Sequence, residues 1–195
     1  MPQIIAHAEL MDSTYRYQRL FYDVTRRYYL LGRDRLIADL APGPDARVLE
    51  IACGTGRNLE KISKRYPNCR LYGLDISNEM LRTAGSKLGR RAWLQQADAC
   101  TFDGREMFSC PGFDRIVISY GVSMIPDWSG AIRNAASQLR PGGELHLVYF
   151  GDQSGLPAGF SRLLHAWLQR FHVTPRATLG AVLDTIAADL GLQAK

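Results

Sequence analysis

The sequence predicts an α/β protein, a three-layer sandwich with a mostly parallel sheet between helices and an added N-terminal helical segment. Three observations support this fold class. From residue 47 to residue 150, short apolar runs alternate with helical patterns. One amphipathic pattern precedes this region and two follow it. The chain has 195 residues, of which 46% are hydrophobic, enough for one well-packed domain but not for two full-sized ones.

The N-terminal part of the chain is expected to be helical over 1–40. Apolar side chains recur at helical spacing from residue 17 to residue 31. Gly32 interrupts this pattern, which resumes over 33–40. A cluster of proline and glycine over 41–45 then ends the segment.

The central part, 47–150, is expected to contain five strands and three helices. The predicted strands are Arg47–Ala52, Arg70–Asp75, Ala92–Gln96, Phe113–Tyr120 and Glu144–Phe150. The predicted helices are Arg57–Tyr66, Asn78–Gly89 and Trp128–Leu139. Two further amphipathic helices are predicted in 151–195, at Phe160–Phe171 and from Leu179 to Leu190. We expect all these parts to form a single domain over 1–195.

Composition narrows the range of functions only a little. The net charge of +5 and a pI of about 9.2 favour an anionic partner such as nucleic acid, a membrane surface or an acidic substrate. No apolar run approaches the roughly 20 residues of a membrane-spanning helix, and no secretory signal pattern begins the chain. The four cysteines lack the spacing of a zinc site or a disulfide framework. We therefore expect a cytoplasmic protein without a metal.

The turn after the first predicted strand indicates a nucleotide-like ligand. Gly54 and Gly56 let the backbone approach a ligand closely, which suits both dinucleotides and S-adenosylmethionine (SAM). The third glycine of the dinucleotide fingerprint would fall at Leu59, which is not glycine. Glu50 would repel a pyrophosphate, whereas SAM carries an ammonium and a sulfonium that a carboxylate attracts. The turn therefore favours a methyl donor.

Two aspartates follow the next strands. Asp75 ends the second predicted strand, where its carboxylate can accept hydrogen bonds from both ribose hydroxyls. Asp98 follows the third strand and could contact the adenine amino group; a solvated loop aspartate is the alternative. Both lie where parallel strands end, which is the edge at which such folds bind ligands.

Together these features resemble the class I SAM-dependent methyltransferase superfamily, whose fold is Rossmann-like. That superfamily has the pattern E-x-[GA]-x-G-x-G, an acid ending strand two, an acid after strand three and a P-G-G turn before strand five. Here the corresponding residues are Glu50–Gly56, Asp75, Asp98 and Pro141–Gly143. The resemblance covers 47–150 and implies that this region is the cofactor-binding core. A dehydrogenase is the alternative.

The cofactor site is thus expected to include residues from the ends of several strands. Its candidate members are Arg33, Glu50, Ala52, Cys53, Gly54, Thr55, Gly56, Asn58, Asp75, Ile76, Met80, Asp98, Ala99 and Ser119. The superfamily sheet usually has seven strands with an antiparallel pair at one edge, and residues beyond Leu192 could supply at most one of them. We expect that this edge is incomplete, that the sequence is truncated, or that another chain completes the edge.

The tyrosine- and arginine-rich stretch over 7–35 looks like the entrance segment of bacterial diacylglyceryl-homoserine N-methyltransferases, which methylate a lipid head-group amine three times to form a betaine lipid. The resemblance implies that 1–40 is a substrate or lid segment. A quaternary ammonium is well held by aromatic faces, and the candidates are Tyr22, Tyr28, Tyr29 and Tyr120; tyrosines that merely pack the helix on the sheet are the alternative.

The transfer would be an in-line displacement that depends mainly on aligning the two reactants. It needs an unprotonated amine, and either Tyr22 or Asp152 could accept the proton. Arg33 could grip the carboxylate of the head group or that of the donor. His146 is expected to be a hydrogen-bonded structural residue and not a base.

The expected partners are an amine-bearing lipid, an anionic membrane surface and the enzyme that makes the homoserine lipid. The predicted helix over 160–171 mixes tryptophan and leucine with arginine and histidine, as a helix on the inner face of the cell membrane would; a helix covering the sheet needs the same pattern.

The alternative acceptors are phosphatidylethanolamine and a quinone precursor. Nucleic acid is disfavoured, because Ser119–Val122 lacks the paired prolines of enzymes acting on base amines. A non-catalytic cofactor-binding module at the membrane is an alternative from a different class.

Overall fold

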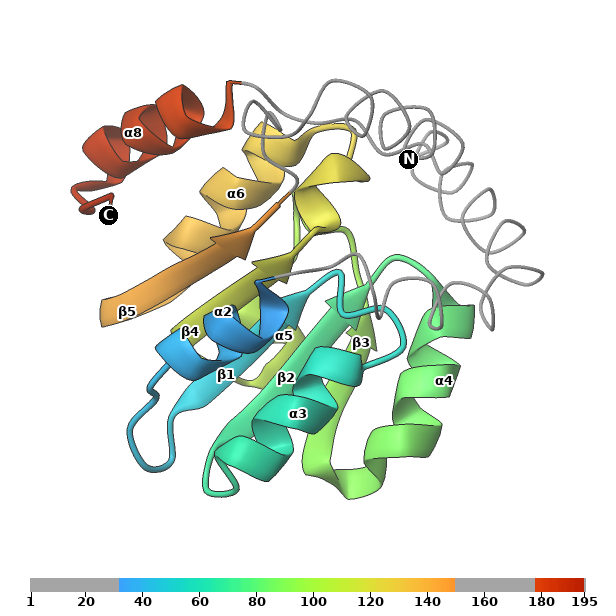
Figure 1. Ribbon diagram of the computed structural model, residues 1–195. Coiled ribbons are helices and arrows are strands. Elements are labelled where there is room, and N and C mark those ends of the chain that lie inside the picture. The colour runs from blue at the N-terminus through green and yellow to red at the C-terminus, as the bar shows by residue number, and fades with distance from the viewer. Residues whose placement is uncertain (1–31, 150–177, 195) are drawn as a thin grey trace, which may run out of the picture.

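The computed structural model describes residues 32–149 and 178–194, which form one parallel sheet and its covering helices (Figure 1). Five parallel strands lie in the order β3-β2-β1-β4-β5. They are β1 (Arg47–Ile51), β2 (Arg70–Asp75), β3 (Ala92–Gln96), β4 (Phe113–Ser119) and β5 (Leu139–Val148). The α-helices are α2 (Arg33–Asp39), α3 (Arg57–Arg65), α4 (Asn78–Leu88), α5 (Gly104–Phe108), α6 (Trp128–Ser137) and α8 (Leu179–Leu190), and two short 3-10 turns are η1 (Gly89–Arg91) and η2 (Gly121–Ser123).

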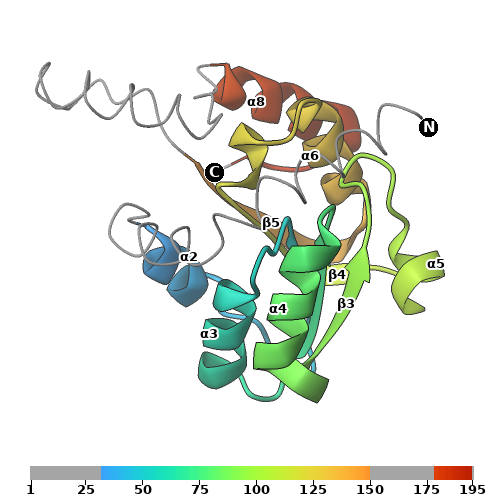
Figure 2. The same cartoon turned by 90° about the vertical axis from the view of Figure 1, so that its right-hand side faces the viewer.

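The helices cover both faces of the sheet, which confirms the predicted α/β sandwich. Helices α2, α3 and α4 lie on one face, and α5, α6 and α8 lie on the other (Figures 1 and 2). Each face has its own apolar core because alternate side chains of a strand point to opposite faces. In β1, for example, Val48 packs with the first group of helices, whereas Leu49 and Ile51 pack with the second.

Close packing between the layers depends on a glycine in the middle of β2. A Cβ atom at Gly73 would lie 2.7 Å from Leu59 Cδ1 and 2.8 Å from Leu94 Cδ2. No side chain fits at those distances. Gly73 therefore lets α3 settle deeply on the sheet, and this sets the position of the turn that precedes α3.

Several predicted boundaries are corrected by the backbone. Strands β1 and β4 end one residue early because Ala52 (φ 54°) and Tyr120 (φ 60°) adopt the left-handed conformation. Strand β5 begins at Leu139 instead of Glu144, because Leu139 already pairs with Phe113. The expected turn over 141–143 is thus an irregularity inside a strand, where the register with β4 shifts.

Some predicted helix ends are corrected as well, since α3 and α4 each end one residue before the expected Tyr66 and Gly89. Helix α6 ends at Ser137, before the expected Leu139, since that residue belongs to β5. Helix α5 was not predicted; it has five residues and is capped by Asp103, whose carboxylate accepts hydrogen bonds from the backbone of Arg105 and Glu106. The prediction of a helix from Leu179 to Leu190 is confirmed by α8. The predicted helices over 17–31 and 160–171 lie outside the described residues.

Strands β3 and β5 form the two edges of the sheet within the described residues. All five strands there are parallel, so the antiparallel pair of the superfamily is not part of 32–149 or 178–194. Within the same ranges, no helix combines the length and the apolar character that crossing a bilayer requires. The carboxyl ends of β1, β2 and β4 all lie at the same end of the sheet, and the candidate site lies at these strand ends.

Candidate functional site

The turn between β1 and α3 has an unusual backbone. Ala52 (φ 54°), Gly54 (φ 55°) and Gly56 (φ 73°) are all in the left-handed region. This region favours glycine, and two of the three residues are glycine. At Gly56 a second reason applies, since a Cβ atom would lie 2.9 Å from both Ala84 and Leu88 of α4. The glycines therefore serve a tight turn and a close helix contact together.

Asp75 joins this turn to the end of β2. Its Oδ2 accepts a hydrogen bond from the Gly54 backbone N–H at 2.8 Å, and its Oδ1 accepts one from the Ser77 N–H at 2.9 Å. The residue is only 7% exposed. Each carboxylate oxygen has a second lone pair, so the group can still accept hydrogen bonds from a ligand at the sheet edge.

Glu50 and Asn58 form a buried pair at the base of the site. Glu50 is 2% exposed, and its Oε1 accepts a hydrogen bond from Asn58 Nδ2 at 2.7 Å. Burial raises the pKa of Glu50 to about 8, against the Asn58 hydrogen bond and the charge of Arg33, which both act to lower it. Glu50 Oε2 and Asn58 Oδ1 are buried without a partner among the described residues. Two neighbouring acceptors in need of a donor suit a ligand with an N–H group that carries positive charge.

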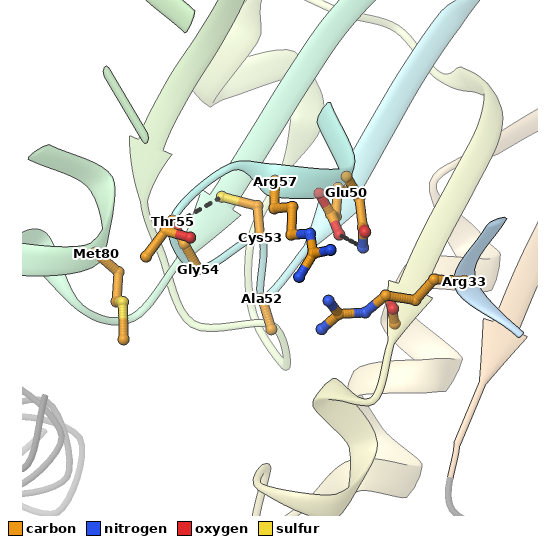
Figure 3. A pocket seen from close by; sticks show the side chains of 10 residues that line it. Arg33, Glu50, Ala52, Cys53, Gly54, Thr55, Arg57 and Met80 are labelled. Carbon is orange, nitrogen blue, oxygen red and sulfur yellow. Dashed lines mark hydrogen bonds between the residues drawn. The ribbon is translucent and has the colours of Figure 1, made fainter. Parts of the chain in front are cut away.

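One pocket brings together most of the predicted cofactor site, although Gly56 and Asp75 are not among its lining residues. Figure 3 shows Glu50 and Arg33 toward one end of the pocket and Met80 at the other, with the Cys53–Thr55 turn between them. The lining residues are Arg33, Glu50, Ala52, Cys53, Gly54, Thr55, Arg57, Asn58, Met80 and Ser119. Of these only Arg57 was not predicted. It is the first residue of α3, and its place in the pocket follows from the direction of that helix, which no motif in the sequence specifies.

Arg33, which lines the pocket, contacts Tyr120, which is not one of the lining residues. Arg33 begins α2, and its guanidinium carbon lies 5.7 Å from the centre of the Tyr120 ring, a cation–π contact. Tyr120 follows β4 and is 5% exposed. Burial raises the pKa of Tyr120, so its hydroxyl keeps its proton at neutral pH.

Two serines near Tyr120 have buried hydroxyl groups without a hydrogen-bond partner among the described residues. Ser119, the last residue of β4, and Ser123 of η2 are 7% and 2% exposed. Ser119 was predicted as a site residue, but Ser123 was not. No sequence pattern distinguishes Ser123 from other serines; only its burial does.

Other predicted residues lie near the pocket without lining it. Gly56 caps α3, Ile76 follows β2, and Asp98 and Ala99 form part of the turn after β3. His146 lies 3.2 Å from Glu144, as a hydrogen-bonded structural residue would, and burial lowers its pKa. The remaining acceptor-side candidates, Tyr22, Tyr28, Tyr29 and Asp152, lie outside the described residues.

Comparisons with known proteins agree with a methyl-donor site. Residues 48–143 match a family described as a methyltransferase domain. The chain is 31% identical over 157 residues to the demethylmenaquinone methyltransferase of Corynebacterium urealyticum, which covers 76% of this chain and 62% of that protein. It is 30% identical over 177 residues to the ubiquinone/menaquinone biosynthesis C-methyltransferase UbiE of Syntrophotalea carbinolica, which covers 86% of this chain and 70% of that protein.

A solved structure shares the fold and holds the cofactor. SAM-bound CalS10, an amino pentose methyltransferase from Micromonospora echinaspora, is 26% identical, with a TM-score of 0.50 over 74% of this chain and 58% of that one. The chain therefore belongs to the class I SAM-dependent methyltransferases, and the dehydrogenase alternative is wrong. It spans 62% of the length of the Corynebacterium relative.

Proposed function

We propose that this methyltransferase transfers methyl groups from SAM to the head-group amine of diacylglyceryl-homoserine, up to three times, to form a betaine lipid. The observation that carries this proposal is where the segment over 7–35 joins the described structure. That segment bears the resemblance to the homoserine-lipid enzymes, and it reaches the core at Arg33, a residue that lines the donor pocket. We propose that residues 1–40 bind the acceptor and 47–150 bind the donor.

In this proposal the described residues hold each part of SAM. Glu50 and Asn58 accept hydrogen bonds from the ammonium group of the donor, because both residues line the pocket and each has a buried oxygen without a partner among the described residues. Asp75 accepts hydrogen bonds from the ribose hydroxyls, and Asp98 accepts one from the adenine amino group. Arg33 binds the carboxylate of the donor or of the lipid head group.

The transfer moves one carbon between two atoms. The amine nitrogen attacks the methyl carbon with its lone pair, the carbon–sulfur bond breaks, and its electrons return to sulfur to leave S-adenosylhomocysteine (SAH). The protein mainly aligns the reactants and excludes water. Tyr120 keeps its own proton and offers its ring, together with Tyr22 and Tyr29, to the increasingly methylated cation.

The acceptor side of the described site suits an amine. An amine becomes nucleophilic once it has lost a proton, whereas a ring carbon needs an ionised hydroxyl beside it. Within residues 32–149 and 178–194, the buried acid of the pocket, Glu50, is paired with Asn58 on the donor side, and Tyr120 is protonated. Proton removal from the bound amine is therefore proposed for Tyr22 or Asp152.

The charge distribution supports a contact with an anionic membrane. The described residues carry 16 basic and 15 acidic side chains, so they are nearly neutral. Most of the excess of the whole chain, 24 basic against 19 acidic, therefore comes from 1–31, 150–177 and Lys195. We propose that these parts contact the inner face of the cell membrane, with the enzyme that makes the homoserine lipid as a further partner.

A second candidate is C-methylation of a quinone precursor. The relatives named above favour it, since both are named for menaquinone or ubiquinone methylation. Sequence similarity to them is stronger evidence for this acceptor than for a lipid amine, and it covers 76% and 86% of this chain, which is more than the donor core over 47–150. Both candidates are amphiphiles with a reactive head and a long apolar tail.

The deciding experiment gives the purified chain methyl-labelled SAM and one acceptor at a time in the same anionic vesicles. The acceptors are diacylglyceryl-homoserine, a demethylmenaquinone and phosphatidylethanolamine, with Asp75→Ala as the inactive control. Labelled mono-, di- and trimethylated homoserine lipid is the expected result. Label in the quinone alone establishes the second candidate, label in phosphatidylethanolamine alone overturns both, and SAM binding without SAH from any acceptor favours a non-catalytic module.

A further inference from the structure

Asn134 of α6 holds the turn that follows β3. Its side-chain amide donates two hydrogen bonds from Nδ2, to the carbonyl oxygens of Ala99 and Phe102, each at 3.1 Å. Ala99 and Phe102 are 7% and 4% exposed and belong to the core on this face of the sheet. A single side chain therefore fixes both sides of a buried turn to a neighbouring helix.

The same turn carries Asp98. Its Oδ1 accepts a hydrogen bond from the Cys100 N–H at 2.8 Å, and its carbonyl oxygen accepts from the N–H groups of Thr101 and Phe102 at 3.2 and 3.0 Å. These bonds lock the carboxylate to the backbone of the turn. Any shift of the turn therefore shifts the carboxylate with it.

Two further bonds fix the turn in relation to the rest of the site. The Ala97 N–H donates to the carbonyl oxygen of Asp75 at 3.1 Å, which links the turn to the end of β2. The Cys100 thiol donates to the carbonyl oxygen of Asp127 at 3.3 Å, and Asp127 is the N-cap residue of α6. Asn134 is thus the side chain through which the middle of α6 controls the position of Asp98.

We propose that Asn134 is a positioning residue for the adenine of the donor: it holds the turn after β3 so that the Asp98 carboxylate faces the exocyclic amino group. The inference rests on the donor role proposed for Asp98, and it is independent of which acceptor is methylated. It predicts that Asn134 sets the selectivity of the site for the amino group as well as the stability of the fold. A residue with only a structural role would change stability alone.

The test measures the binding of two ligands by titration calorimetry: SAH, and the SAH analogue whose purine carries hydrogen in place of the 6-amino group. The wild type should prefer SAH about 10-fold, the effect of one hydrogen bond to a charged acceptor. In Asn134→Asp a carboxylate replaces the amide donor and repels both carbonyl oxygens. Its preference for SAH should fall to about 2-fold, mainly through weaker binding of SAH.

A matched control makes the same chemical change on the same helix face. Gln138, the C-cap residue of α6, accepts a hydrogen bond from the Gly104 N–H at 2.9 Å through its Oε1, and Gln138→Glu keeps that acceptor. This variant should keep the 10-fold preference. Asp98→Ala should lose it, and adding Asn134→Asp to Asp98→Ala should change it no further, because both act through one carboxylate.

An Asn134→Asp variant that binds both ligands more weakly but keeps the 10-fold preference would overturn the proposal, as would a further loss of preference in the double variant. If circular dichroism shows that Asn134→Asp does not fold, Asn134→Ala replaces it with the same two expected outcomes. No acceptor is present in these titrations, so failure of the lipid proposal would leave their result unchanged.

Discussion

Two turns face each other at the carboxyl edge of the sheet, and they are built differently. The turn after β1 has glycine at two of its three left-handed positions. Asp75 at the end of β2 accepts a hydrogen bond from Gly54 of this turn, and Asn58 of α3 donates one to Glu50 of β1. In the turn after β4, the residue in the left-handed region is Tyr120 and not a glycine. A left-handed conformation costs a non-glycine residue on the order of 1–3 kcal/mol.

The unpartnered atoms of the two turns differ in the same way. Beside the β1 turn they are acceptors, Glu50 Oε2 and Asn58 Oδ1, next to groups that are already paired. Beside the β4 turn they are two serine hydroxyls, which can donate or accept. The first turn is thus specialised for one cationic ligand, whereas the second is adaptable. Each turn holds one non-glycine residue, Ala52 or Tyr120, in the left-handed conformation. The difference in unpartnered atoms is what we expect of a shared donor on one side and a variable acceptor on the other.

The largest effect is predicted at the β1 side. Asp75→Ala removes the acceptor for the Gly54 and Ser77 N–H groups and for the ribose, so SAM affinity should fall by about 100-fold or more, measured by calorimetry. Asp114→Ala is the matched control, because Asp114 also accepts a backbone hydrogen bond at 2.8 Å, from Arg47 at the opposite end of the sheet. Equal losses of affinity in the two variants would contradict the special role of the β1 turn.

The pH dependence of SAM binding tests the two hydrogen-bond acceptors beside that turn, Glu50 and Asn58. In the empty site the pKa of Glu50 is about 8, so the carboxyl is mostly protonated at pH 7. An ammonium beside it favours the ionised form and lowers that pKa in the complex, so binding releases a proton. Affinity should rise by up to about 10-fold per pH unit from pH 6 toward pH 8, and fall above it as the amino group of SAM itself loses its proton.

Glu50→Gln provides the control for this measurement. The amide keeps the shape of the side chain but cannot ionise, so binding should be weaker by about 10-fold at pH 8 and nearly constant from pH 6 to pH 8. Calorimetry in buffers with different ionisation enthalpies counts the protons released. A wild type whose affinity does not change over this range would mean that Glu50 does not meet the ammonium.

The turn after β1 was easier to predict from the sequence than the turn after β4. Glu50, Gly54, Gly56 and Asp75 lie at the strand ends where short stretches of sequence predicted them, and their role in donor binding stays a prediction. The contact between Arg33 and Tyr120 brings together residues far apart in sequence, and only the packing of α2 creates it. Local patterns predict local geometry, so the β4 side was harder to predict.

The errors in the fold have a related cause. Pro141, Gly142 and Gly143 have the composition of a turn, yet pairing with β4 draws the chain into a strand at Leu139. Helix α5 is too short for a period to be visible, and its stability comes from a cap and from Phe108 packing against Tyr72 and Phe113. In both cases tertiary contacts outweigh local preference.

A smaller effect is predicted for the unpartnered hydroxyl in η2. Ser123→Ala removes a buried group that forms no hydrogen bond among the described residues, so it should stabilise the empty protein by about 1 kcal/mol and raise Tm by about 2–4 °C. Ser137→Ala, on the exposed side of α6, should leave Tm nearly unchanged. A decrease in Tm for Ser123→Ala would mean that the hydroxyl has a partner in the folded protein and that the β4 side is not left open for the acceptor.

The smallest effect is predicted for removal of the Tyr120 hydroxyl. Because burial keeps its hydroxyl protonated and Arg33 lies over its ring, the ring should matter more than the oxygen. Tyr120→Phe should therefore keep kcat/KM for the acceptor within about 3-fold of the wild type, whereas Tyr120→Leu, which removes the aromatic face, should lower it by about 10-fold or more. Loss of activity in Tyr120→Phe that grows as the pH rises toward the pKa of Tyr120 would instead make the ionised hydroxyl the group that takes the proton from the acceptor. The strained turn would then serve to aim that oxygen, and the aromatic face would be secondary.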